Sequence, residues 1–140
     1  MHVRSIEDVS ELCHLELSSE VETFASNWWK RLESGPSALI VLALVGESAP
    51  PGLLLCRIHE QVLYCDYLDP GKVASPDLAT YLLMGSLRTK GNKHQVARVV
   101  IDEEQCNNFG VNQALAVLGF NKAPQAHAQY PAETALEWVS

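Results

Sequence analysis

One aspartate stands in an otherwise apolar segment, and its side chain is the one best suited to chemistry. Asp66 belongs to Gln61–Leu68, where successive side chains of a strand would alternate between two faces. One face would hold Val62, Tyr64, Asp66 and Leu68, and the other Cys65 and Tyr67. Burying a carboxylate is costly unless it is paired. Asp66 is therefore a candidate general base or ligand for an acceptor group, with Tyr64 beside it. The alternative is a hydrogen-bonded structural aspartate, or one on an exposed face.

A second candidate is the start of a predicted helix at Ser75-Pro76-Asp77. Ser75 suits the N-cap and Pro76 the first helical position. A helix N-terminus presents unpaired N–H groups and the positive end of the helix dipole, so it can bind an anion. Asp77 opposes this with a negative charge in the first turn, and Pro76 removes one donor. The alternative interpretation is an ordinary strong helix start.

Composition argues against several other classes of site. The five histidines and four cysteines show no spacing typical of metal ligands, so we predict no metal site and assign the cysteines as buried or partly buried thiols. The 140 residues carry a net charge of −7, which repels nucleic acid. The local basic cluster of Arg88, Lys90 and Lys93 is too thin to offset that charge.

The apolar segments are too short for a membrane span. The longest, Ala38–Val45, falls far below the roughly 20 residues that a spanning helix needs. The N-terminal residues also lack the apolar run of a signal peptide. We therefore expect no membrane association and a cytoplasmic location.

The first third of the chain predicts a short strand and two helices. Val3–Ile6 alternates as an edge strand does, and a helix over residues 7–17 follows, capped by Ser5 or Asp8. A second helix is predicted over Val21–Leu32. Its apolar stripe would be formed by Phe24, Trp28 and Leu32, with Trp28 in the core and Trp29 partly exposed.

The remaining elements complete a single α/β domain over residues 1–140. Predicted strands are Ala38–Val45, Leu53–Ile58, Gln61–Leu68, Val96–Ile101 and Ala135–Val139. The helix from Ser75 to Gly91-Asn92 would use Leu78, Leu82 and Leu87 as its stripe, and Asn108 would cap a helix over Phe109–Leu118. The order β-α-α-β-β-β-α-β-α-β requires a mixed, mostly antiparallel sheet of about six strands flanked by about four helices.

This order resembles the GNAT (GCN5-related N-acetyltransferase) family, and short segments along nearly the whole chain support the resemblance. Arg4 to Leu12 resembles the family's opening Arg-x-x-x-x-Asp segment, and Leu68-Asp69-Pro70 resembles the Val-x-Pro that ends its fourth strand. Asn108 to Val111, followed by Leu118-Gly119-Phe120, resembles its Asn-x-x-Ala … Leu-Gly-Phe segment. In that fold the fourth and fifth strands separate at a bulge and open a V-shaped cleft.

The cofactor signature of the family is degraded. Its pyrophosphate loop reads Arg/Gln-x-x-Gly-x-Gly/Ala, and the matching stretch here is Ala74–Ala79. Asp77 and Ala79 would replace the two glycines, and only Ala79 is a permitted variant, while the basic residue would be Lys72 or Ala74. The tyrosine that often protonates the leaving thiolate is replaced by Leu115. The chain thus resembles a divergent member of the GNAT family, one that has lost much of the acetyl-CoA signature.

The resemblance implies an acyl-CoA-dependent N-acyltransferase that transfers acetyl from acetyl-CoA to a small-molecule or protein amine. Asp66 and Tyr64 would then serve catalysis. The cofactor contacts would come from Leu68, Lys72, Ser75, Leu78, Ala79 and Asn108. The altered loop favours a different possibility, a non-catalytic GNAT-like module that regulates or binds a partner protein. A third possibility is an unrelated small α/β domain, for example an oligomer subunit, and a homodimer is compatible with each.

Overall fold

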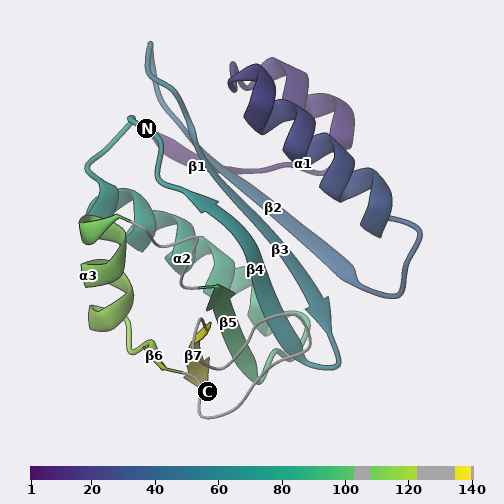
Figure 1. The fold of residues 1–140 in the computed structure, drawn as a ribbon, viewed down its shortest axis with the longest axis vertical. Coiled ribbons are helices and arrows are strands. Elements are labelled where there is room, and N and C mark those ends of the chain that lie inside the picture. Colours follow the sequence, from purple (N-terminus) through teal and green to yellow (C-terminus); the bar gives the residue numbers. More distant parts are fainter. Residues whose placement is uncertain (103–107, 123–134, 140) are drawn as a thin grey trace.

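The computed structural model describes residues 1–102, 108–122 and 135–139, which form a seven-stranded sheet with helices on both faces (Figure 1). Along the sheet the strands follow the order β1-β2-β3-β4-β5-β7-β6. Their bounds are β1 His2–Ser5, β2 Ala38–Val45, β3 Gly52–His59, β4 Val62–Asp69, β5 Arg98–Asp102, β6 Asn121–Lys122 and β7 Ala135–Val139. The predicted mixed sheet is confirmed, with β6 as an additional strand of only two residues.

The centre of the sheet is an antiparallel meander followed by a parallel crossover. β2, β3 and β4 pair in turn as antiparallel neighbours, because their short connections allow each strand only to fold back on the one before. The chain then crosses one face as α2 (Pro76–Asn92) and returns as β5, which pairs parallel to β4. This crossover places the start of α2 at the carboxyl end of β4.

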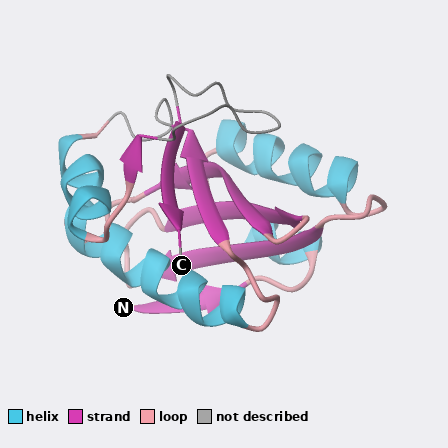
Figure 2. Cartoon of the chain, turned by 90° about the horizontal axis from the view of Figure 1, so that it is seen from below, coloured by secondary structure: helices cyan, strands magenta, loops and turns pink. Residues whose placement is uncertain are grey.

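Helices cover the two faces of the sheet separately, as Figure 2 shows. The 3-10 helix η1 (Val9–His14) and α1 (Ser19–Leu32) pack on one face against Val41, Leu53 and Leu55. α2 and α3 (Phe109–Val117) pack on the other face, against a larger core that includes Leu54 and Leu63. No helix in the described ranges is long and apolar enough to cross a membrane.

The first helical segment is shorter and tighter than predicted. Asp8 caps η1 in a capping box with Glu11, so of the two predicted caps Asp8 is the one used. The predicted helix over residues 7–17 was wrong in extent, because the 3-10 segment ends at His14 and Glu16 adopts φ 56°, which a helix cannot contain.

Both long helices turn a slightly different face to the sheet than predicted. Trp29 is buried beside Trp28, whereas Phe24 is 47% exposed, because the stripe of α1 includes Ala25 and lies one residue further along. In α2 the buried stripe likewise passes through Leu83 and not Leu82, and Leu78 is 42% exposed. Side chains one residue apart differ by about 100° around a helix, so packing decides between them.

Candidate active site at the bulge in β4

A β-bulge at Asp66 divides β4 into two halves. Leu55 of β3 is paired with Tyr67 and Cys56 with Cys65, so Asp66 is an extra residue between two ladder positions. A bulge of this kind reverses the alternation of side chains beyond it. Leu68 therefore packs in the core under α2, and Tyr67 packs on the α1 face. The predictions that Leu68 shares a face with Tyr64 and that Tyr67 faces away were both wrong, for this reason.

The same bulge separates β4 from β5. The parallel ladder between them runs from Val62 and Arg98 to Cys65 and Ile101, and it ends there. Beyond that point β4 continues to Asp69 paired with β3, while Asp102 of β5 pairs with β7. A gap inside the sheet exposes backbone N–H and C=O groups that a continuous sheet would pair. The open edge of β4 after Cys65 is a place where an extended ligand can form hydrogen bonds with the backbone.

Asp66 is held by two donors from other elements. Its Oδ2 accepts hydrogen bonds of 2.9 Å from Trp28 Nε1 of α1 and from Arg57 Nε of β3. The side chains of Arg57 and Asp66 are only 7% and 13% exposed, so the pair lies almost entirely inside the protein. Arg57 also stacks on the buried ring of Tyr64, with Cζ 4.4 Å from the ring centroid. The structure thus brings the two predicted catalytic side chains together around a cation that the sequence reasoning had not considered.

The bulge also brings Tyr67 and Asp69 onto the α1 face beyond Asp66. The Tyr67 hydroxyl donates to Asp69 Oδ2 at 3.3 Å. Burial, reinforced by the nearby Asp69 carboxylate, raises the pKa of Tyr67 to about 12. Tyr67 therefore stays protonated at neutral pH and can donate a hydrogen bond or a proton, but it is no general base. Strict alternation along the strand did not predict this pair. The adjacent polar residues Asp66 and Tyr67 were the one signal in the sequence for a bulge.

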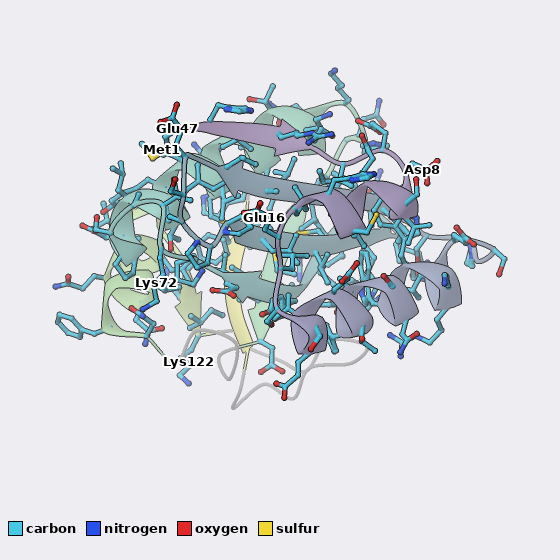
Figure 3. The ribbon with its side chains drawn as sticks, turned by 90° about the horizontal axis from the view of Figure 1, so that it is seen from above. Met1, Asp8, Glu16, Glu47, Lys72 and Lys122 are labelled. Carbon is cyan, nitrogen blue, oxygen red and sulfur yellow. The ribbon has the colours of Figure 1, made fainter. Side chains whose placement is uncertain are left out.

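The loop after β4 offers three consecutive backbone donors next to a lysine. The N–H of Gly71 is bonded to Asp69 Oδ1 and that of Lys72 to the Pro50 carbonyl, each at 2.9 Å. The following N–H groups, over residues 73–75, have no acceptor within the described ranges of the chain. The Lys72 side chain is exposed at the same end of the molecule as Glu47 and away from Asp8 (Figure 3). These groups could hold part of an anion.

The first turn of α2 contains a negatively charged side chain, the carboxylate of Asp77. The Ser75 side chain makes no capping bond to the helix, and its hydroxyl instead donates to Asp77 Oδ1 at 2.6 Å. This bond and one from the Leu78 N–H hold the pKa of the Asp77 carboxyl below its usual value. The carboxylate thus occupies the helix N-terminus. Of the two predicted cofactor contacts in this turn, the Leu78 side chain is exposed to solvent, whereas the Ala79 side chain is fully buried.

The first turn of α3 lies directly against that of α2. Asn108 caps α3, because its Oδ1 accepts from the N–H groups of Gly110 and Val111 at 2.9 and 3.4 Å. A Cβ on Gly110 would lie 3.0 Å from Pro76 Cβ, so this glycine allows the two helix starts to touch. Leu115 is fully buried in the core, which leaves no proton donor at the position where the family resemblance places a tyrosine.

The cysteines and histidines form no metal site in the described part of the chain, where no group of three or more potential ligands lies together. Cys56 and Cys65 do meet across β3 and β4, with their Sγ atoms 3.4 Å apart, and both are free thiols. Burial, followed by the hydrogen bond with Cys65, raises the pKa of the Cys56 thiol well above its usual value. Cys56 is therefore an unreactive core thiol at neutral pH, and Cys65 is equally buried beside it.

Two solved structures share the architecture of this chain over nearly its whole length. No protein-family model and no curated protein sequence matches the chain. The putative acyl-CoA N-acyltransferase from Klebsiella pneumoniae subsp. pneumoniae MGH 78578 matches with a TM-score of 0.58 and 15% identity, over 98% of this chain and 95% of that one. The ribosomal-protein-S18-alanine N-acetyltransferase from Escherichia coli matches with a TM-score of 0.55 and 20% identity, over 96% and 89%.

The chain has the GNAT fold. This confirms the resemblance stated from the sequence and excludes an unrelated α/β topology. The bulge at Asp66 and the separation of β4 from β5 are the features that the GNAT resemblance implied. At these identities the likeness concerns the fold alone, so the residues around the GNAT cleft decide what this chain can do.

Proposed function

We propose that the protein is an acyl-CoA-dependent N-acyltransferase, transferring acetyl from acetyl-CoA to an amine of a small molecule or a protein. The observation that carries the proposal is the gap between β4 and β5, which ends next to the starts of α2 and α3. An acyl-pantetheine arm is extended and rich in amides, so it suits the open edge of β4. The N–H groups of residues 73–75 and the ammonium of Lys72 support binding of the pyrophosphate.

The reaction follows from the placement of these groups. The amine nitrogen attacks the thioester carbon, the C–S bond breaks, and the sulfur leaves as the thiolate of coenzyme A, which then takes a proton from water. Backbone N–H groups of β4 near Leu68 would stabilise the oxyanion that forms on the carbonyl oxygen. The Asp66 carboxylate would take the amine proton directly or through water, with Tyr64 beside it. Its ion pair with Arg57 holds the Asp66 carboxylate in place beside the Tyr64 ring.

Calorimetric titration with acetyl-CoA tests the binding step. We expect micromolar binding, and about tenfold tighter binding for Asp77→Asn, because one negative charge about 4 Å from a phosphate costs on the order of 1 kcal/mol or more. In Asp77→Asn, the amide oxygen can still accept the hydrogen bond from the Ser75 hydroxyl. Asp8→Asn is the matched control, since Asp8 caps η1 at the other end of the molecule and should leave the affinity unchanged. Absence of heat up to millimolar acetyl-CoA in all three proteins would refute the proposal.

Substitution of Asp66 tests the assignment of the base. Once an amine screen has identified an acceptor, we expect Asp66→Asn to lower turnover about 100-fold or more without weakening acetyl-CoA binding, because general base catalysis contributes roughly that much. Asparagine still accepts from the Trp28 indole but leaves Arg57 without its carboxylate, so turnover is compared after thermal denaturation has shown the variant to be folded. Unchanged turnover would remove Asp66 from the mechanism and leave it a structural residue.

A second function is favoured by the first turn of α2. The Asp77 carboxylate already occupies the anion position, and the buried Leu115 cannot protonate a thiolate. Both observations suit a non-catalytic GNAT-like module that regulates or binds a partner protein. Phe109, at the start of α3, is 78% exposed and gives such a surface an aromatic contact. The titration distinguishes the two functions, since only the first requires acetyl-CoA binding.

A further inference from the structure

A small apolar cavity lies between α2 and the strands β5 and β7, away from the open edge of β4. Its volume is about 80 Å³, and its walls are aliphatic or aromatic apart from two polar side chains. The apolar walls come from α2, from the strands beneath it and from the segment after α3, and they include Leu63, Met84, Leu87, Val99, Phe120 and Trp138. None of these residues belongs to the proposed acyltransferase site.

Gly85 lies at the solvent-exposed edge of the cavity. It lies in the interior of α2, where glycine destabilises a helix by about 0.5–1 kcal/mol relative to alanine. A Cβ built on Gly85 would meet no atom within 4 Å, so the packing of the chain does not require a glycine there. Gly85 also lines the cavity. Its missing side chain therefore leaves this edge of the cavity uncovered and accessible from solvent.

Two polar side chains mark the rim of the cavity. Arg88 and Asn92 lie four residues apart on α2 and face the same side of the helix. The Arg88 guanidinium stacks on the Trp138 ring, with Cζ 4.9 Å from the centroid. Arg88 forms no ion pair with the carboxylates of the described residues. Stacking uses the face of the guanidinium, so the N–H donors on its edge remain able to bind a carboxylate.

We propose that this cavity binds a small aliphatic monocarboxylate, with its chain among the apolar walls and its carboxylate on Arg88 and Asn92. Its volume is about half that of the roughly 150 Å³ engineered cavity that binds benzene, which suits a chain of about four carbons. The chain's net charge of −7 opposes anions in general, and the C-terminal end of α2 carries partial negative charge. Arg88 must therefore supply the selectivity for the anion.

Pentanoate is the probe for this site, followed by the indole N–H signal of Trp138 in NMR titrations, with assignment by Trp138→Phe. We expect pentanoate to shift that signal and acetate, which lacks the chain, to bind at least about tenfold more weakly. Pentanol tests the contribution of charge. Arg88→Gln should weaken pentanoate about tenfold or more and leave pentanol unchanged, because only the carboxylate uses the guanidinium. Arg31→Gln, an exposed arginine at the end of α1, is the matched control.

Gly85→Leu should abolish the response to both pentanoate and pentanol by filling the opening. Should that variant fail to fold, Gly85→Ala provides the test, since its Cβ meets nothing and should weaken both probes without loss of stability. Equal binding of acetate and pentanoate, or unchanged pentanoate binding in Arg88→Gln, would overturn the proposal. Because acetyl-CoA binding uses other residues, failure here leaves the acyltransferase proposal standing, and the converse also holds.

Discussion

Replacement of Arg57 by methionine should lower the free energy of unfolding by about 3–5 kcal/mol, because it leaves the Asp66 carboxylate buried without its cation. The two side chains are joined at 2.9 Å and are largely shielded from water. Methionine preserves much of the length and apolar volume of arginine, so the loss reports mainly the charge. Urea denaturation followed by tryptophan fluorescence measures the change, since Trp28 bonds to the same carboxylate oxygen.

Two further variants test whether the charge is the cause. Arg4→Met removes the exposed pair with Glu11, whose side chains are 43% and 30% exposed, and should cost less than about 1 kcal/mol. Adding Asp66→Asn to Arg57→Met should recover most of the loss, because the amide is neutral and still accepts from Trp28. Equal costs for Arg57→Met and Arg4→Met would contradict the assignment of a buried pair.

Replacement of Gly71 by alanine should destabilise the protein by about 2–4 kcal/mol, from a left-handed backbone and a steric clash together. Gly71 has φ +67°, and a Cβ there would lie 2.4 Å from both the Gly52 nitrogen and the Pro51 carbonyl carbon. Backbone atoms cannot rotate away as a side chain can. The change should also weaken acetyl-CoA binding, because Gly71 precedes the Lys72 loop. Thermal denaturation and the same titration measure the two effects.

Gly85→Ala is the control for Gly71→Ala. Gly85 is helical and its Cβ would meet nothing, so alanine should stabilise the protein by up to about 1 kcal/mol. If Gly71→Ala lowers the free energy of unfolding and Gly85→Ala raises it, the local backbone geometry decides the effect of replacing each glycine. A loss below about 1 kcal/mol for Gly71→Ala would mean that the loop after β4 can rearrange.

The amino-acid sequence determined the architecture because its signals are local. The apolar run over β2, the turn residues between β2 and β3, and the Ser75-Pro76 helix start each depend on neighbours in the chain. Their order left few topologies, and the GNAT fold was among them. The GNAT resemblance also placed Asp77 in the pyrophosphate loop and Leu115 at the position of the family's tyrosine, so both departures were visible in the sequence once the family pattern was aligned.

Tertiary structure decided how the candidate site is arranged. No local pattern reveals that Asp66 is an extra residue in the ladder, because a bulge is defined by the partner strand. That one residue placed Leu68 in the core, moved Tyr67 to the opposite face and ended the ladder between β4 and β5. The bonds from Trp28 and Arg57 to Asp66 join residues 38 and 9 positions apart, and only packing can bring them together.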